Sequence, residues 1–103
     1  MPAHPSDRRR LKRVLTRNSE YFFRDDVCIA VRKRETGEWI EAHPALSLKV
    51  EGGIRFSDAG SLKLHPRAPE VGDWMIFDGS DLVTAQIEEV GRPPAEIGRS
   101  LAR

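Results

Sequence analysis

The clearest fold signal lies at residues 71–90, which read VGDWMIFDGSDLVTAQIEEV. Two segments rich in β-branched and aromatic residues, 71–77 and 82–90, flank the turn-forming residues Asp78-Gly79-Ser80-Asp81. Two such segments joined by a short polar turn are typical of a β-hairpin. The sequence therefore predicts a pair of antiparallel strands here, closed at its end by Gly91 and two prolines.

The same alternation of apolar and polar residues extends back to Tyr21,. Further strands are expected at 21–23, 27–33, 39–40, 46–50, 54–56 and 62–64. Turns are expected at 34–38, 52–53 and 57–60, where glycine and small polar residues gather,. No segment between the strands is long enough for the crossover helix that parallel pairing requires. We predict a mainly β fold, a small antiparallel barrel or bent sheet of about six or seven short strands.

The first part of the chain is strongly basic, although the net charge of the 103 residues is only +1. Residues 1–17 carry six basic side chains against one acidic one, a net charge of +5. The remaining residues carry 11 basic and 15 acidic side chains, a net charge of −4. The sequence thus predicts a basic arm on an acidic body. The basic residues of the arm are Arg8, Arg9, Arg10, Lys12, Arg13 and Arg17.

A short N-terminal basic helix is predicted over residues 7–16. Ser6 is a suitable N-cap, and the apolar residues Leu11, Val14 and Leu15 recur at helical spacing,. The chain is then divided into a basic arm or short helix at 1–17, a β-rich domain at 18–92 and a polar C-terminal tail at 93–103.

No constellation of catalytic or metal-ligating residues is apparent in the sequence. The histidines His4, His43 and His65 lack the spacing of metal ligands,. Cys28, the single cysteine, lies in an apolar run and is expected to be a small buried residue,. We expect no catalytic residue, no metal site and no cofactor, and therefore no enzymatic activity.

The composition, with 39% hydrophobic and 32% charged residues, is that of a globular protein without membrane spans, which we expect to be cytoplasmic,. The first functional hypothesis is a small, non-catalytic intracellular module for interaction or assembly, whose partner is another protein or its own subunit. Trp39 and Trp74 are the expected anchors, because large aromatic rings dominate interface energetics. The alternative hypothesis is nucleic-acid binding through the basic arm, where arginine and lysine would contact phosphates.

Overall fold

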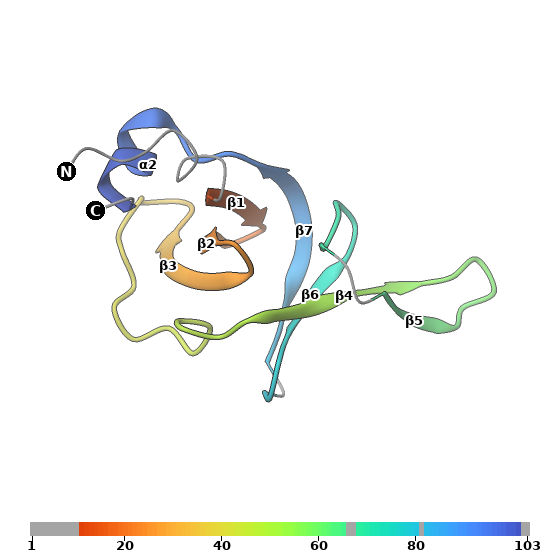
Figure 1. Cartoon of the computed structure of the whole chain (residues 1–103). Helices are drawn as coiled ribbons and strands as arrows, with labels where there is room; N and C mark the ends of the chain where they lie inside the picture. Colours follow the sequence, from red (N-terminus) through yellow and green to blue (C-terminus); the bar gives the residue numbers. More distant parts are fainter. Residues whose placement is uncertain (1–10, 66–67, 81, 102–103) are drawn as a thin grey trace.

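The computed structural model describes residues 11–65, 68–80 and 82–101. Its elements are β1 (Leu11–Thr16), β2 (Ser19–Arg24), β3 (Val27–Lys33), β4 (Val50–Phe56), β5 (Leu62–His65), β6 (Trp74–Phe77), β7 (Val83–Gly91) and α2 (Ala95–Leu101). The seven strands form one curved antiparallel sheet, a half-barrel, in the order β3-β2-β1-β7-β6-β4-β5 (Figure 1). The prediction of a mainly β, antiparallel fold is confirmed. No helix among the described residues is long and apolar enough to cross a membrane.

The predicted N-terminal helix is wrong, because residues 11–16 form β1, which lies between β2 and β7 in the sheet. Val14 faces the core, whereas Leu11 and Leu15 alternate onto the opposite face, and all three are buried,. A central strand with apolar residues on both faces thus reproduces the spacing of a helical stripe. The rest of the predicted helix, residues 7–10, lies outside the described residues.

The one helix in the described part of the chain is α2, in the segment for which the sequence predicts only a polar tail. It follows Pro93-Pro94 and carries Glu96 in its first turn and Arg99 in its last turn, which suits the helix dipole,. A cavity between α2 and the sheet is lined by Leu11 of β1 together with Ala95 and Gly98. The Arg24 guanidinium of β2 donates a hydrogen bond to the Leu101 carbonyl, so α2 is tied to the sheet.

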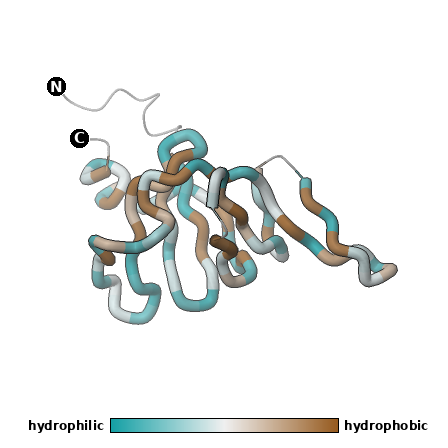
Figure 2. The backbone as a smooth tube through the Cα atoms, turned by 90° about the horizontal axis from the view of Figure 1, so that it is seen from below, coloured by the Kyte–Doolittle hydropathy of each residue, from teal (hydrophilic) through white to brown (hydrophobic). Residues whose placement is uncertain are grey.

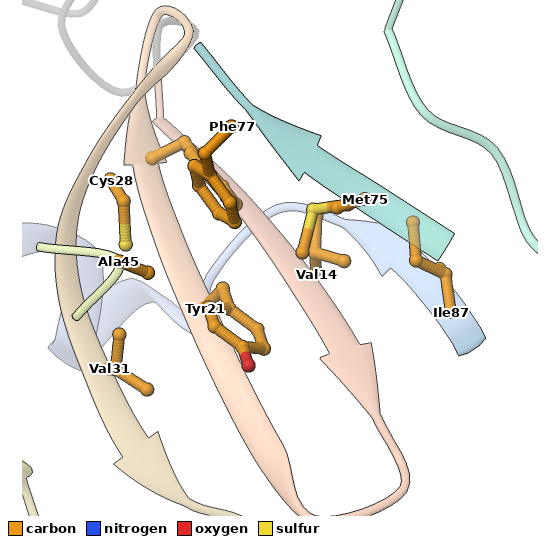
Figure 3. Packing of buried hydrophobic residues seen from close by; sticks show 9 residues of the cluster. Val14, Tyr21, Cys28, Val31, Ala45, Met75, Phe77 and Ile87 are labelled. Carbon is orange, nitrogen blue, oxygen red and sulfur yellow. The ribbon is translucent and has the colours of Figure 1, made fainter. Parts of the chain in front are cut away.

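The hydrophobic core lies on the inner face of the half-barrel, where side chains from most of the strands meet (Figure 3). The rings of Phe23 and Phe77 stack with their centroids 6.3 Å apart. Cys28 is fully buried, as predicted, and burial raises the pKa of its thiol to about 12. The core consists of Val14, Tyr21, Phe23, Cys28, Val31, Ala45, Met75, Phe77 and Ile87.

The outer edge of β3 is covered by chain segments that leave and approach it. The turn predicted at 34–38 is present, with Gly37 at a φ of 72°, and it brings Ile40 back to donate a hydrogen bond to the Val31 carbonyl. Further along, the Cys28 amide donates to the Leu48 carbonyl at 2.9 Å. At the other edge of the sheet, β5 pairs with β4 alone among the described residues.

The turn predicted at Gly52-Gly53 is wrong, because both glycines lie within β4. Both are buried there, and β4 has an irregular register against β6 between Val50 and Gly52. An ideal Cβ at position 53 would lie 2.5 Å from an Asp73 carboxylate oxygen. Glycine at position 53 therefore serves a close approach between β4 and a buried carboxylate, not a reversal of the chain.

Candidate docking face on the projecting hairpin

The β4–β5 hairpin projects from the body of the half-barrel (Figures 1 and 2). At its turn the Ser57 amide donates to the Ser61 carbonyl at 2.7 Å, and the Gly60 amide donates to the Ser57 carbonyl at 2.8 Å. Gly60 has a φ of 80°, which completes a three-residue hairpin loop with a glycine bulge,. The turn predicted at 57–60 is thus confirmed, and its hydrogen bonds fix the register of the two strands.

That register places apolar side chains on one face of the hairpin. Phe56 lies opposite Leu62, Ile54 lies opposite Leu64, and Trp74 of β6 lies beside Ile54. The rings of Phe56 and Trp74 meet edge to face, with centroids 5.7 Å apart. We name these five residues the apolar hairpin face.

Much of the apolar hairpin face is open to solvent. The exposed fractions are 58% for Phe56, 60% for Leu62 and 51% for Leu64. Hydrophobic positions recur along the hairpin in Figure 2. Fully burying one such side chain contributes about 1.5–3 kcal/mol of favourable free energy. A partner that covers all three would therefore gain substantial binding free energy. Contiguous exposed apolar patches of this kind mark interaction sites more often than isolated exposed residues do.

The opposite face of the hairpin is polar and is held by the buried carboxylate of Asp73, which directly precedes β6. Arg55 of β4 donates from Nε to Asp73 Oδ1 at 2.8 Å, and His65 Nε2 of β5 lies 2.9 Å from Asp73 Oδ2. The Glu70 amide also donates to Oδ2, at 2.8 Å. We name these four residues the Asp73 clasp.

The Asp73 clasp connects the hairpin to the body. The Ile87 amide of β7 donates to the Asp73 carbonyl at 2.8 Å, which fixes the backbone of this residue against the sheet. Burial alone would raise the pKa of the Asp73 carboxyl, but the Glu70 amide, His65 and Arg55 together lower it below its ordinary value,. Asp73 has no exposed surface with which to meet a substrate. Its charge therefore positions the hairpin.

The two tryptophans predicted as anchors lie at separate places. Trp74 is half-buried in the apolar hairpin face, whereas Trp39 lies beside β3 and is 44% exposed. The Trp39 ring is 5.5 Å from that of Phe22, and the Arg32 guanidinium lies over both rings. Trp39 thus belongs to an arginine–aromatic cluster beside β3, whereas Trp74 packs against Phe56 of the hairpin.

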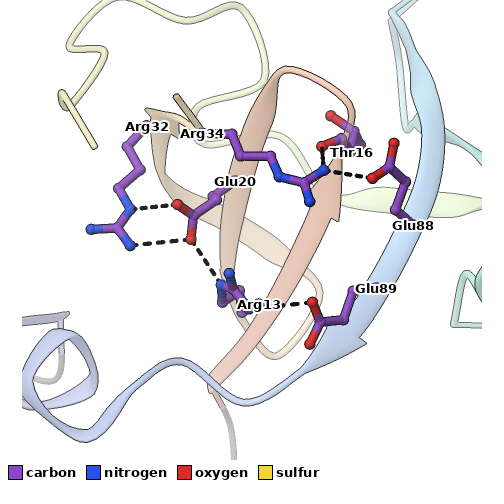
Figure 4. Close-up of polar contacts among 7 residues, drawn as sticks. All are labelled: Arg13, Thr16, Glu20, Arg32, Arg34, Glu88 and Glu89. Atoms are coloured by element: carbon purple, nitrogen blue, oxygen red, sulfur yellow. Dashed lines mark hydrogen bonds and ion pairs between the residues drawn. The ribbon is translucent and has the colours of Figure 1, made fainter. Parts of the chain in front are cut away.

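Arg13, predicted as part of the basic arm, is paired with acidic residues on the outer face of the sheet (Figure 4). Its Nε donates to the Glu20 carboxylate at 2.8 Å, and Glu89 lies 3.9 Å away. Arg32 binds the same Glu20 carboxylate at 2.9 Å. Burial alone would raise the pKa of Glu20, but the two arginines lower it. Arg13 is therefore engaged in ion pairs within the fold.

Two further arm residues, Lys12 and Arg17, lie within the described part of the chain. Lys12 lines a small cavity together with Val14, Phe23 and Asp26. Arg17 is exposed in the β1–β2 turn, at an open cleft, and its side chain makes no hydrogen bond or ion pair with the described residues. Arg8, Arg9 and Arg10 lie outside the described residues. The three described members, Lys12, Arg13 and Arg17, therefore have separate surroundings.

The residues of the hairpin site were largely missed by sequence reasoning, apart from Trp74. A signal was available, because Ile54 and Phe56 alternate before the predicted turn and Leu62 and Leu64 alternate after it. Pairing across a short turn must place such residues on one face. Whether other parts of the chain cover that face depends on the tertiary fold, which the alternation does not determine.

Metal binding has no support in the described part of the chain, where no three histidine, cysteine, aspartate or glutamate side chains gather as ligands.

Comparison with known proteins identifies no matching family, no similar curated protein and no similar solved structure. The candidate function therefore depends on the geometry of this chain itself.

Proposed function

We propose that this protein is a non-catalytic interaction module that binds a partner protein through the apolar hairpin face. The observation that supports the proposal is the exposure of Phe56, Leu62 and Leu64 side by side on a projecting hairpin. Trp74 at the base of this face supplies the kind of large aromatic side chain that dominates interface energetics,.

The support beneath the face suits a docking surface. The Asp73 clasp holds both strands of the hairpin from the opposite side, through Arg55 and His65. A surface that is already ordered loses less conformational entropy when it binds. The hairpin therefore presents its apolar residues in a fixed arrangement before the partner arrives.

Nucleic-acid binding through the basic arm is the weaker hypothesis. Arg13 is already ion-paired with Glu20 and lies near Glu89, so its guanidinium is less available to a phosphate. The predicted basic helix is absent over residues 11–16, which form β1. This hypothesis becomes an outcome of the experiment that tests the docking proposal.

The experiment places a photo-crosslinking residue at position 62, within the apolar hairpin face. As an exposed control, a separate variant carries it at position 36, in the turn that follows β3. The full chain is irradiated in its native host, and adducts are compared before and after nuclease treatment. We expect one defined protein adduct from position 62, absent from position 36 and insensitive to nuclease. A second variant, Phe56→Ser, should abolish this adduct without unfolding the protein.

Three outcomes would contradict the proposal. They are the same adducts from both positions, an adduct from position 62 that survives Phe56→Ser, and loss of all adducts on nuclease treatment. Removal of the whole predicted arm, residues 1–17, would delete β1 from the middle of the sheet, so a truncation that tests the arm must retain Leu11 and all residues after it.

A further inference from the structure

We infer that the outer edge of β5 binds an extended strand of a partner protein in which apolar residues alternate with acidic ones. This inference rests on the proposed docking function and specifies the partner. Adding a strand to an exposed sheet edge is a common mode of peptide recognition, in which main-chain hydrogen bonds supply affinity and alternate side chains supply specificity.

The main-chain groups of β5 that point outward follow from the register of the hairpin. The Ser57 amide bonds to the Ser61 carbonyl, so this pair is of the hydrogen-bonded kind. In an antiparallel ladder such pairs alternate with pairs whose main-chain groups point away from each other. Lys63 and His65 therefore bond to β4, and Leu62 and Leu64 direct their N–H and C=O groups to the outer edge.

The edge of β5 is open in a way that the edge of β3 is not. Residues of the segments 38–40 and 47–50 form main-chain hydrogen bonds along the outer edge of β3. Among the described residues β5 pairs with β4 only. Of the two outer strands of the half-barrel, β5 is the one along whose outer edge the described residues form no main-chain hydrogen bond.

The side chains of β5 define the chemistry of the strand that would pair with it. Leu62 and Leu64 belong to the apolar hairpin face, so a neighbouring strand should place apolar residues on that side. Lys63 lies on the opposite side, directly across from Arg55. Arg55 is bound to Asp73, whereas the Lys63 side chain has no ion pair with the described residues. An acidic residue across from Lys63 would provide the missing opposite charge.

The same charge argues against a second copy of this chain as the occupant. Two copies could pair their β5 strands in antiparallel orientation, with Leu62 of each opposite Leu64 of the other. This register places the two Lys63 side chains directly opposite each other. Like charges directly opposite each other destabilise an antiparallel pair. A strand with an apolar–acidic–apolar pattern avoids this repulsion, because its acidic residue lies opposite Lys63 and pairs with it.

The test uses two synthetic peptides, one alternating valine with glutamate and one alternating valine with lysine. Each is titrated into the full chain, and binding is followed by the anisotropy of a dye on the peptide. We expect the glutamate peptide to bind about fivefold more tightly than the lysine peptide, because opposite charges replace like charges across the strands. Lys63→Glu should reverse this preference, whereas Lys33→Glu at the other end of the sheet, where Lys33 is paired with Glu38, should not.

Amide hydrogen exchange then locates the bound strand. The glutamate peptide should slow the exchange of the Leu62 and Leu64 amides, which point outward, and leave that of Lys63, which already bonds to β4, nearly unchanged. Leu64→Pro removes one outward donor at an edge position that tolerates proline, and it should abolish binding. Circular dichroism of this variant checks that the sheet remains folded.

The inference is overturned if neither peptide binds, if Lys63→Glu leaves the preference unchanged, or if protection appears on β3. It is also overturned if sedimentation shows a dimer whose Leu62 and Leu64 amides are protected without peptide. A crosslinked adduct from position 62 combined with no peptide binding would reject edge pairing and retain the docking function. Loss of that adduct as well would reject both.

Discussion

The body of the half-barrel and the β4–β5 hairpin distribute their side chains in opposite ways. In the body, the core residues Val14, Met75 and Phe77 point inward and are buried. In the hairpin, the charged residues lie on the inner side with Asp73, and the apolar residues Phe56 and Leu62 point to solvent. Hydrophobic burial stabilises the body, whereas strand pairing and the Asp73 clasp hold the hairpin. The apolar residues of the hairpin are therefore available to a partner without loss of the fold.

The sharpest test of this contrast compares two phenylalanines on neighbouring strands. Phe77→Ala should lower the free energy of unfolding by about 3–5 kcal/mol, because it leaves a cavity in the core. Phe56→Ala should lower it by about 1 kcal/mol or less, because that ring is 58% exposed,. Urea denaturation followed by circular dichroism measures both. Equal losses would show that the hairpin shares the core of the body.

A second test introduces one methyl group into the contact between β4 and the Asp73 clasp. Gly53→Ala should cost about 1–3 kcal/mol, because the new Cβ would lie 2.5 Å from Asp73 Oδ2 and must displace it,. Gly91→Ala is the matched control, since Gly91 also lies in a strand and its added Cβ meets no atom within 4 Å. Thermal unfolding of the two variants should differ clearly, and equal melting temperatures would contradict the close approach.

A third test uses pH, because the charge of Asp73 holds the hairpin. The lowered pKa of Asp73 means that its ionised form stabilises the native state at pH values above the ordinary 3.8 and that this contribution is lost as pH falls through the native pKa,. Asp73→Asn should cost about 1–2 kcal/mol at neutral pH. The difference from the natural chain should shrink in acid, as measured by urea denaturation at several pH values. A difference that stays constant down to pH values well below 3.8 would contradict the assignment.

The smallest effect is expected at an exposed ion pair of the body. The Arg34 guanidinium binds the Glu88 carboxylate, and both side chains are substantially exposed (Figure 4). Glu88→Gln should change the free energy of unfolding by no more than about 0.5 kcal/mol, because solvent and salt screen such pairs. A much larger loss in chemical denaturation would show that charge stabilises the body as it does the hairpin.

The secondary-structure elements that the sequence predicts correctly are those whose ends are marked by turn residues. The strand at 27–33 and the hairpin of β6 and β7 are bounded by clear turn residues, and they are present,. The segment 11–16 is apolar on both faces, so local spacing could not separate a central strand from a helix. In α2 the glycine at position 98 weakens the helical pattern, and the prolines before it are equally typical of a loop,.

The candidate site was harder to predict than the fold. Trp74 was identified by its residue type, yet Leu62 and Leu64 have the same alternation as strands that are buried. Their exposure depends on how far the hairpin extends past its neighbours, which is a property of the whole sheet. The Asp73 clasp joins residues from three separate segments, Arg55, His65 and Asp73, and no local spacing links them.

The place of β1 in the sheet has a consequence for synthesis on the ribosome. β1 pairs on one side with β7, so that Val14 lies opposite Val90, although 75 residues separate them along the chain. During translation β1, β2 and β3 emerge early as a meander whose inner face has nothing to pack against. We therefore expect the nascent chain to gain its stable fold only when β7 has left the exit tunnel, in one late and cooperative step.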